Sequence, residues 1–157
     1  MINALLILAI VVLLVLTFRG HRRNQAAAAE NGDAEAQFLA ENKHKEGVVE
    51  LDCGVQMLWH TRNQAGEQPS AKSKVTVHYR GTLLDGSEFD NSQKRGQPLT
   101  FKLNQVISGW QQGLLAMHAG ERATLYIPAK LAYGNRRVGN IAPASLLIFD
   151  VELIAVN

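Results

Sequence analysis

The chain has 157 residues, a formal net charge of +2 and one cysteine, Cys53. This length suits a single domain with an appended segment. A charge so close to zero gives no long-range attraction to phosphate, which argues against a nucleic-acid partner. One cysteine excludes an intramolecular disulfide and a multi-cysteine metal site, and the five histidines are scattered, so we expect no bound metal.

The N-terminus is strongly apolar. Residues 2–18 read INALLILAIVVLLVLTF, and Asn3 and Thr17 are the only clearly polar side chains among them. A helix of this length approaches the roughly 30 Å core of a bilayer, so the pattern predicts a transmembrane helix that anchors the protein in the cell inner membrane. A cleaved signal peptide is the alternative, but RGHRRNQ separates the apolar run from the first alanines, where such a peptide has small residues.

Basic residues follow the apolar run directly. Arg19, Arg22 and Arg23 would keep their side of the membrane cytoplasmic by the positive-inside rule. The globular part is therefore expected in the cytoplasm, with the periplasm as the alternative. Residues 19–47 read as a tether and a short helix, because Asp33 can cap a helix that runs through AEAQFLAENKHK to a stop near a glycine.

From residue 48 on, the pattern is typical of strands. In KVTVHYRGTL, Val75, Val77 and Tyr79 alternate with polar side chains, which indicates a sheet with one wet face. Strand-like runs are also found in VVEL, VQMLWH, LTFKL, ERATLYIP and SLLIFDVELIAV, and LDGSEF contains a tight DG turn. We predict that residues 48–157 form an α+β domain, an antiparallel sheet wrapped around one short helix.

That helix is the segment VISGWQQGLLAM, residues 106–117. Its apolar side chains recur at helical spacing around Trp110. Gly109 and Gly113 interrupt it, although each glycine costs about 1 kcal/mol relative to alanine in a helix interior. We interpret both glycines as positions where the helix closely approaches its surroundings.

No motif for covalent or phosphoryl chemistry is present. The sequence has no GxSxG, GxxxxGK[ST] or GxGxxG motif and no Cys/His cluster. A carboxylate dyad among Asp85, Glu88 and Asp90 is one alternative, although the DG turn explains the first of these. A concentration of aromatic and apolar residues remains, which is either an ordinary core or a pocket. Phe89 and Tyr133 favour a pocket, because they lie in the turn-like stretches DGSEFDNS and LAYGNRR.

Four segments carry a family resemblance. The runs VTVHYRGTLLDGSEFDNS, VISGWQQGL, LAYG and LLIFDVEL resemble, in order and spacing, the FKBP-type peptidyl-prolyl cis-trans isomerases, over residues 48–157. The preceding FLAENKHKEGVVEL is similar to the bacterial macrophage infectivity potentiator branch of that family. Those relatives carry a long dimerising N-terminal region where this chain has an apolar span and a tether. The resemblance therefore does not imply that this chain forms a dimer.

The resemblance implies a pocket with two sets of residues. The implied catalytic residues are Tyr79, Phe89, Asp90, Trp110 and Tyr133, and the implied substrate-binding residues are Phe101, Val106, Ile107, Ile141 and Phe149. Trp110 would form the floor, the Ile107 N–H would donate a hydrogen bond to a substrate carbonyl, and Asp90 would orient Tyr79. Leu99 departs from the family pattern, because many relatives have an aromatic residue there, and the loop NRRVGNIAPAS is slightly short.

The implied activity is rotation of Xaa-Pro bonds in polypeptide substrates, assisting protein folding without metal or cofactor. Macrolides of the tacrolimus type are expected inhibitors. The alternative from another class is a membrane-tethered chaperone or protein-binding module that uses the same pocket without turnover. The plainest alternative is a domain whose aromatic residues form only a core.

Overall fold

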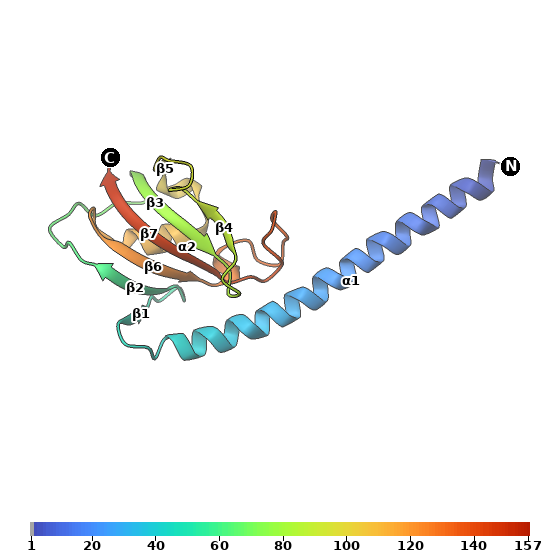
Figure 1. The fold of residues 1–157 in the computed structure, drawn as a ribbon, viewed down its shortest axis with the longest axis horizontal. Helices are drawn as coiled ribbons and strands as arrows, with labels where there is room; N and C mark the ends of the chain where they lie inside the picture. The colour runs from blue at the N-terminus through green and yellow to red at the C-terminus, as the bar shows by residue number, and fades with distance from the viewer. Residues whose placement is uncertain (1) are drawn as a thin grey trace.

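The computed structural model describes residues 2–157, and their side chains from residue 6 on. Within this range, seven strands form one antiparallel sheet in the order β1-β2-β6-β7-β3-β4, and β5 also pairs with β3 (Figure 1). The strands are β1 Val48–Glu50, β2 Gln56–Thr61, β3 Lys74–Thr82, β4 Glu88–Asn91, β5 Leu99–Lys102, β6 Arg122–Ile127 and β7 Leu147–Val156. The predicted α+β architecture is confirmed.

One face of the sheet is buried, as the alternation in the sequence predicts. In β3, Val75 and Val77 are fully buried and Tyr79 is 7% exposed, while the residues between them are at least partly exposed. The same pattern buries Val151 and Leu153 in β7, which pairs with both β3 and β6 at the centre of the sheet. The core therefore lies on the side of the sheet that holds the short helix.

That helix, α2, spans Ser108–Leu115 and lies against β6. A Cβ on Gly113 would lie 2.1 Å from Cδ2 of Leu125, and a Cβ on Gly109 would lie 2.2 Å from Cγ2 of Ile127. No side chain fits in either space unless the side chain of Leu125 or Ile127 moves. The interpretation of both glycines as points of close approach is confirmed.

The N-terminal region differs from the prediction. One helix, α1, runs without interruption over Ile2–Asn42, where we expected a span, a tether and a separate helix. The four alanines at 26–29 have the highest helix propensity of any residue, and the NGD signal at 31–33 is overridden because α1 packs on the domain there. Phe38, for example, packs against Tyr126 of β6 with ring centroids 5.6 Å apart.

The predicted transmembrane anchor over residues 2–18 is not confirmed. Among the described residues, no helix combines the length and the apolar character needed to cross a bilayer. The apolar stretch passes directly into the basic and polar residues RGHRRNQ of the same helix. Met1 lies outside the described residues.

The short strand β4, Glu88–Asn91, has no counterpart in the prediction. Its residues EFDN are mostly polar and all are half-buried, so they do not show the alternation that reveals a strand. The strand forms because Asp90 and Asn91 pair with β3 in register. This pairing brings Phe89 and Asp90 to the edge of the site described next.

Candidate functional site

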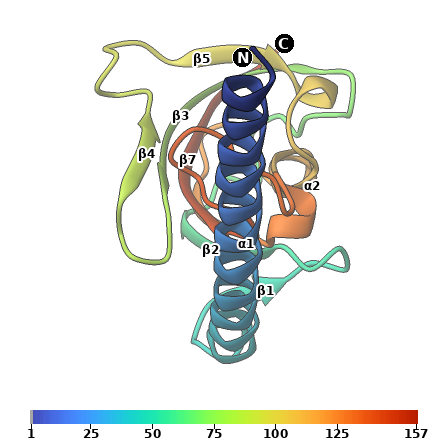
Figure 2. The same ribbon diagram turned by 90° about the vertical axis from the view of Figure 1, so that its right-hand side faces the viewer.

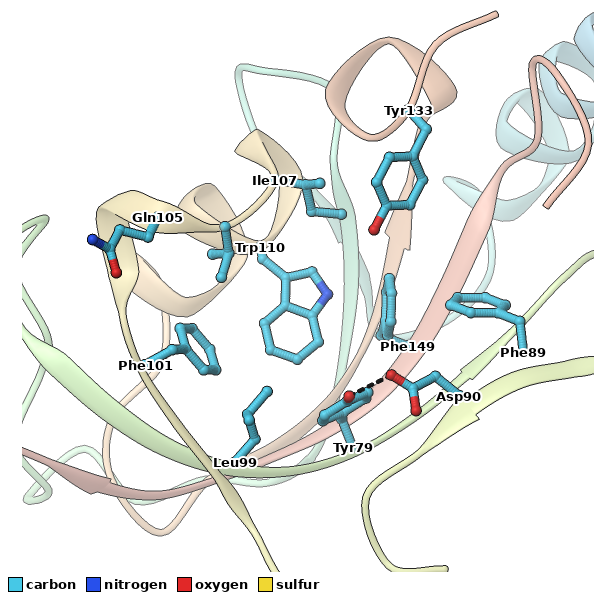
Figure 3. Close-up of a pocket in the computed structure, with 11 residues that line it drawn as sticks. Tyr79, Phe89, Asp90, Leu99, Phe101, Gln105, Ile107, Trp110, Tyr133 and Phe149 are labelled. Atoms are coloured by element: carbon cyan, nitrogen blue, oxygen red, sulfur yellow. Dashed lines mark hydrogen bonds between the residues drawn. The ribbon is translucent and has the colours of Figure 1, made fainter. Parts of the chain in front are cut away.

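A cavity of about 390 Å³ opens between α2, the sheet and the loop after β6 (Figure 3). Trp110 of α2 lies at its base and is 5% exposed. Tyr79 and Phe149 come from the central strands, and Tyr133 reaches in from the loop after β6, with its hydroxyl directed into the pocket. The full lining is Tyr79, Phe89, Asp90, Leu99, Phe101, Gln105, Val106, Ile107, Trp110, Tyr133 and Phe149.

The aromatic rings hold one another edge to face. The Trp110 ring lies 5.1 Å from both Tyr79 and Phe149, centroid to centroid, at interplanar angles of 85° and 90°. Phe89 meets Phe149 at 5.4 Å and 88°, and Phe101 lies 5.5 Å from Trp110. Such arrangements are favourable because the positive edge of one ring faces the negative face of the next. The aromatic side chains therefore pack against one another and form an apolar wall of the pocket.

Gly81 in β3 makes room for two of these rings. A Cβ at Gly81 would lie 2.5 Å from Cζ of Phe89 and 2.9 Å from Cε1 of Phe149. Any larger residue would push the two rings out of their edge-to-face contact. A glycine in the middle of a strand weakens the strand, so its presence here marks a close approach of neighbouring groups.

One wall of the pocket is polar. The Tyr79 hydroxyl donates a hydrogen bond to Oδ2 of Asp90 at 2.5 Å and accepts one from Nη2 of Arg95 at 2.8 Å. Arg95 also donates to the other oxygen of Asp90, which receives a further hydrogen bond from the Asn91 N–H at 2.9 Å. The carboxylate thus accepts three hydrogen bonds, from Tyr79, Arg95 and Asn91.

These contacts decide the protonation of the pair. Burial raises the pKa of Asp90, but the hydrogen bonds from Tyr79 and Arg95 outweigh burial and bring the pKa below its usual range. Burial and the hydrogen bond to Asp90 raise the pKa of Tyr79. At neutral pH the rim therefore presents a neutral phenol held by an ionised carboxylate, and the carboxylate does not act as a base.

The alternative of a carboxylate dyad is wrong. The Asp85 carboxylate accepts hydrogen bonds from the Ser87 N–H at 2.8 Å and from the Ser87 hydroxyl at 2.6 Å. Glu88 pairs with Arg80 and Lys94, both at 2.7 Å. Since each carboxylate has separate partners, no two of them share a site.

The structure brings nine of the ten candidate site residues around this one cavity. The exception is Ile141, which is 6% exposed and packs in the core cluster instead. Sequence reasoning did not assign a site role to Leu99, Gln105 or Arg95. The adjacency of Gln105 to Val106 is a usable signal for the second. Arg95 lies five residues after Asp90, but nothing in the sequence places Arg95 beside Tyr79 before β3 and β4 pair.

Comparison with known proteins identifies the family. Residues 65–154 match the family described as FKBP-type peptidyl-prolyl cis-trans isomerase. The chain belongs to this family. Residues 14–57 match the domain amino-terminal to FKBP-type peptidyl-prolyl isomerase. That match corrects the expectation that an unrelated span and tether replace the N-terminal region of the relatives.

The chain is similar to individual known proteins over most of its length. The chain is 44% identical over 130 residues to the FKBP-type peptidyl-prolyl cis-trans isomerase FkpA of Aeromonas hydrophila, covering 83% of this chain and 48% of that protein. It is 44% identical over 131 residues to the outer membrane protein MIP of Legionella longbeachae, covering 83% and 56%. The chain thus spans about half the length of the curated relatives it matches.

Two solved structures share the fold. The crystal structure of FkpA from Escherichia coli superposes with a TM-score of 0.85 at 35% identity, covering 94% of this chain and 71% of that one. A peptidyl-prolyl cis-trans isomerase from Pseudomonas syringae gives a TM-score of 0.77 at 41% identity, covering 83% and 96%.

Proposed function

We propose that the protein is a peptidyl-prolyl cis-trans isomerase that acts on Xaa-Pro bonds of polypeptide chains. The observation that carries the proposal is the apolar pocket over Trp110, with Tyr79 and Tyr133 as neutral polar groups at its edge. The membership of the family supports the same activity.

The chemistry needs no nucleophile. Rotation about an amide must overcome about 18–20 kcal/mol, because resonance gives the C–N bond partial double-bond character. In the twisted transition state that resonance is lost, and the carbonyl oxygen carries less negative charge and depends less on water. A dry pocket lined by aromatic rings therefore favours the twisted amide over the planar one, which is the condition for catalysis.

The residues take separate roles in this scheme. The prolyl ring would lie against Trp110, held by dispersion and the burial of apolar surface. The N–H of Ile107, just before α2, and the hydroxyl of Tyr133 would orient the substrate backbone. Asp90 would act only by fixing the Tyr79 hydroxyl. None of these contacts stabilises the planar amide in preference to the twisted one, so the binding energy lowers the barrier to rotation.

A protease-coupled assay on short Xaa-Pro peptides tests the activity. Unaided isomerisation takes tens of seconds at 25 °C. Catalytic amounts of the protein are expected to shorten this phase in proportion to their concentration, and Trp110→Ala is expected to lose most of the effect. A wild-type rate equal to the uncatalysed one would overturn the proposal.

The alternative, a module that holds polypeptides without turnover, has one observation in its favour. Leu99 and Tyr133 at the pocket are 40% and 37% exposed, which offers apolar surface to an unfolded chain. A protein that suppresses aggregation of an unfolded client while leaving the peptide rate unchanged would have this function.

We also propose that the pocket takes macrolides of the tacrolimus type. Its volume and apolar lining suit a ligand that buries a large ring system. A ligand present at 100 times its Kd stabilises the native state by about 2.7 kcal/mol, so tacrolimus is expected to raise the Tm. An unchanged Tm at saturating concentration would contradict this proposal.

A further inference from the structure

The second half of α1 lies against the loop that follows β6, as Figures 1 and 2 show. Two hydrogen bonds fix the ends of this loop to α1, and the guanidinium of Arg137 between them donates to Oδ1 of Asn24 at 3.4 Å. Oε2 of Glu35 accepts the backbone N–H of Ala129 at 2.8 Å, and Nδ2 of Asn31 donates to the backbone carbonyl of Pro143 at 2.9 Å. Residues four apart lie on the same face of a helix. One face of α1 therefore holds both ends of the segment 129–143.

The segment between these two contacts carries Tyr133, and its backbone connects Tyr133 to both of them. The Ala129 carbonyl accepts the N–H of Gly134 at 2.8 Å, and the Gly134 carbonyl accepts the N–H of Ala144 at 2.8 Å. Gly134 is the residue after Tyr133, so a displacement of either end of the segment would reach the pocket-lining tyrosine.

The contact requires partial desolvation of the Glu35 carboxylate, which is unfavourable. It is half-buried, and burial raises its pKa, while the hydrogen bond from Ala129 and the charge of Lys130 act in the opposite direction. Desolvation of a carboxylate is unfavourable unless hydrogen bonds replace its water. Glu30 lies earlier on the same helix and is exposed. The contrast indicates that Glu35 has a specific role at Ala129.

We propose that Glu35 and Asn31 are positioning residues for the isomerase site, through which α1 holds the 129–143 segment so that Tyr133 stays over the pocket. The inference rests on the proposed function, since Tyr133 is given a role there. It assigns to the helix outside the sheet a direct effect on the substrate site.

The test uses the full chain and three variants in the peptide assay. Glu35→Ala leaves the Ala129 N–H without its acceptor, and we expect kcat/KM to fall about fivefold, mainly through KM, because a mobile Tyr133 orients substrate poorly. Glu35→Gln keeps a carbonyl acceptor and is expected to recover most of the loss. Glu30→Ala is the matched control and is expected to match wild type.

A double-mutant cycle identifies the route of the effect. If Glu35 acts through Tyr133, Glu35→Ala is expected to cost little further activity in a Tyr133→Ala background. Full additivity of the two losses would overturn the inference. So would wild-type kinetics in both Glu35→Ala and Asn31→Ala, whereas an inactive wild-type protein would instead overturn the proposed function.

Hydrogen exchange gives a readout independent of activity. The amides of Ala129, Gly134 and Ala144 are expected to exchange faster in Glu35→Ala than in Glu30→Ala, and equal rates would contradict the inference. If Glu35→Ala fails to fold, Asn31→Ala, which removes the other contact, carries the same comparison against Glu30→Ala. A role limited to stability would lower Tm without changing KM well below Tm.

Discussion

At the residue scale, the site depends on a few positions where one side chain decides the geometry of several others. Gly81 leaves space for Phe89 and Phe149, and Asp90 holds Tyr79 in a single orientation. Neither residue needs to touch the substrate to matter. Both act by reducing the freedom of the groups that do, which is the basis of a preorganised site.

Substitutions at Asp90 separate its hydrogen bonds from its charge. Asp90→Asn keeps an oxygen acceptor for the Tyr79 hydroxyl and is expected to lower kcat/KM by less than about fivefold, whereas Asp90→Leu removes the acceptor and is expected to cost about tenfold or more. Peptide-assay kinetics of the two variants measure this. If Asp90→Asn proves the more damaging of the two, the positioning role is wrong.

At the element scale, the pairing of β3 with β4 and the packing of α2 on β6 bring the site together. β4 carries Phe89 and Asp90, and its pairing is supported by Glu88, which bridges Arg80 of β3 and Lys94 of the following turn. α2 lies so close to β6 that two of its positions accept only glycine without rearrangement. Each element is placed by contacts with partners distant in the sequence.

Two glycine substitutions are expected to have opposite effects. In Gly113→Ala the added Cβ meets Leu125 at 2.1 Å, so we expect a loss of about 1–3 kcal/mol in the free energy of unfolding despite the better helix propensity. In Gly32→Ala of α1 nothing lies within 4 Å, and a gain of up to about 1 kcal/mol is expected. Urea unfolding measures both, and a stabilised Gly113→Ala would contradict the close packing.

Glu88 gives the β3–β4 hairpin a defined pH dependence. Its hydrogen bonds with Lys94 and Arg80 lower its pKa from 4.5 to about 2. Because the folded pKa lies below the unfolded one, the contribution to stability is present above pH 4.5 and is lost as pH falls toward 2. Thermal unfolding between these pH values is expected to show a smaller pH dependence in Glu88→Gln than in wild type. An identical dependence would show that the pairing contributes nothing.

At the scale of the whole molecule, the long helix and the sheet are joined by buried polar contacts as well as by apolar packing. Gln56 of β2 is fully buried, and its amide donates to the carbonyl of Leu39 near the end of α1 and to Glu50, both at 2.9 Å. The side-chain amide of Asn42, the last residue of α1, donates to the side-chain oxygen Oε1 of Gln56 at 2.9 Å. Gln56 therefore gives the buried Asn42 amide its acceptor and adds a second donor to the Leu39 carbonyl, which also accepts the Lys43 N–H at 3.3 Å.

Removal of this connection is expected to be costly. Gln56→Ala leaves the buried Asn42 amide without its acceptor and removes one of the two donors to the Leu39 carbonyl, and we expect a loss of about 1–3 kcal/mol in the free energy of unfolding. Gln37→Ala, at an exposed position of α1, is the control and is expected to change stability by less than about 0.5 kcal/mol. Calorimetry compares the two, and equal effects would show that α1 is not coupled to the sheet through Gln56.

Local pattern predicted much of this molecule correctly. The alternation of Val75, Val77 and Tyr79 with polar residues predicts a strand with one buried face. The aromatic residues around Trp110 favour a pocket. The predicted break between an N-terminal span and a separate short helix is wrong because long-range contacts outweigh the local pattern there. An apolar run and a turn signal depend on neighbouring residues alone, while contacts of Asn31 and Glu35 with a segment about 100 residues away extend the helix through that signal.

By itself the sequence determined which side chains could form a core and a pocket, because hydrophobic periodicity and glycine placement follow from short-range chain geometry. Three features follow from the folded arrangement alone: Arg95 meets Tyr79, Ile141 lies in the core cluster, and α1 reaches the loop bearing Tyr133. These contacts depend on strand register and helix packing, which close loops between distant residues. No local pattern encodes such distances.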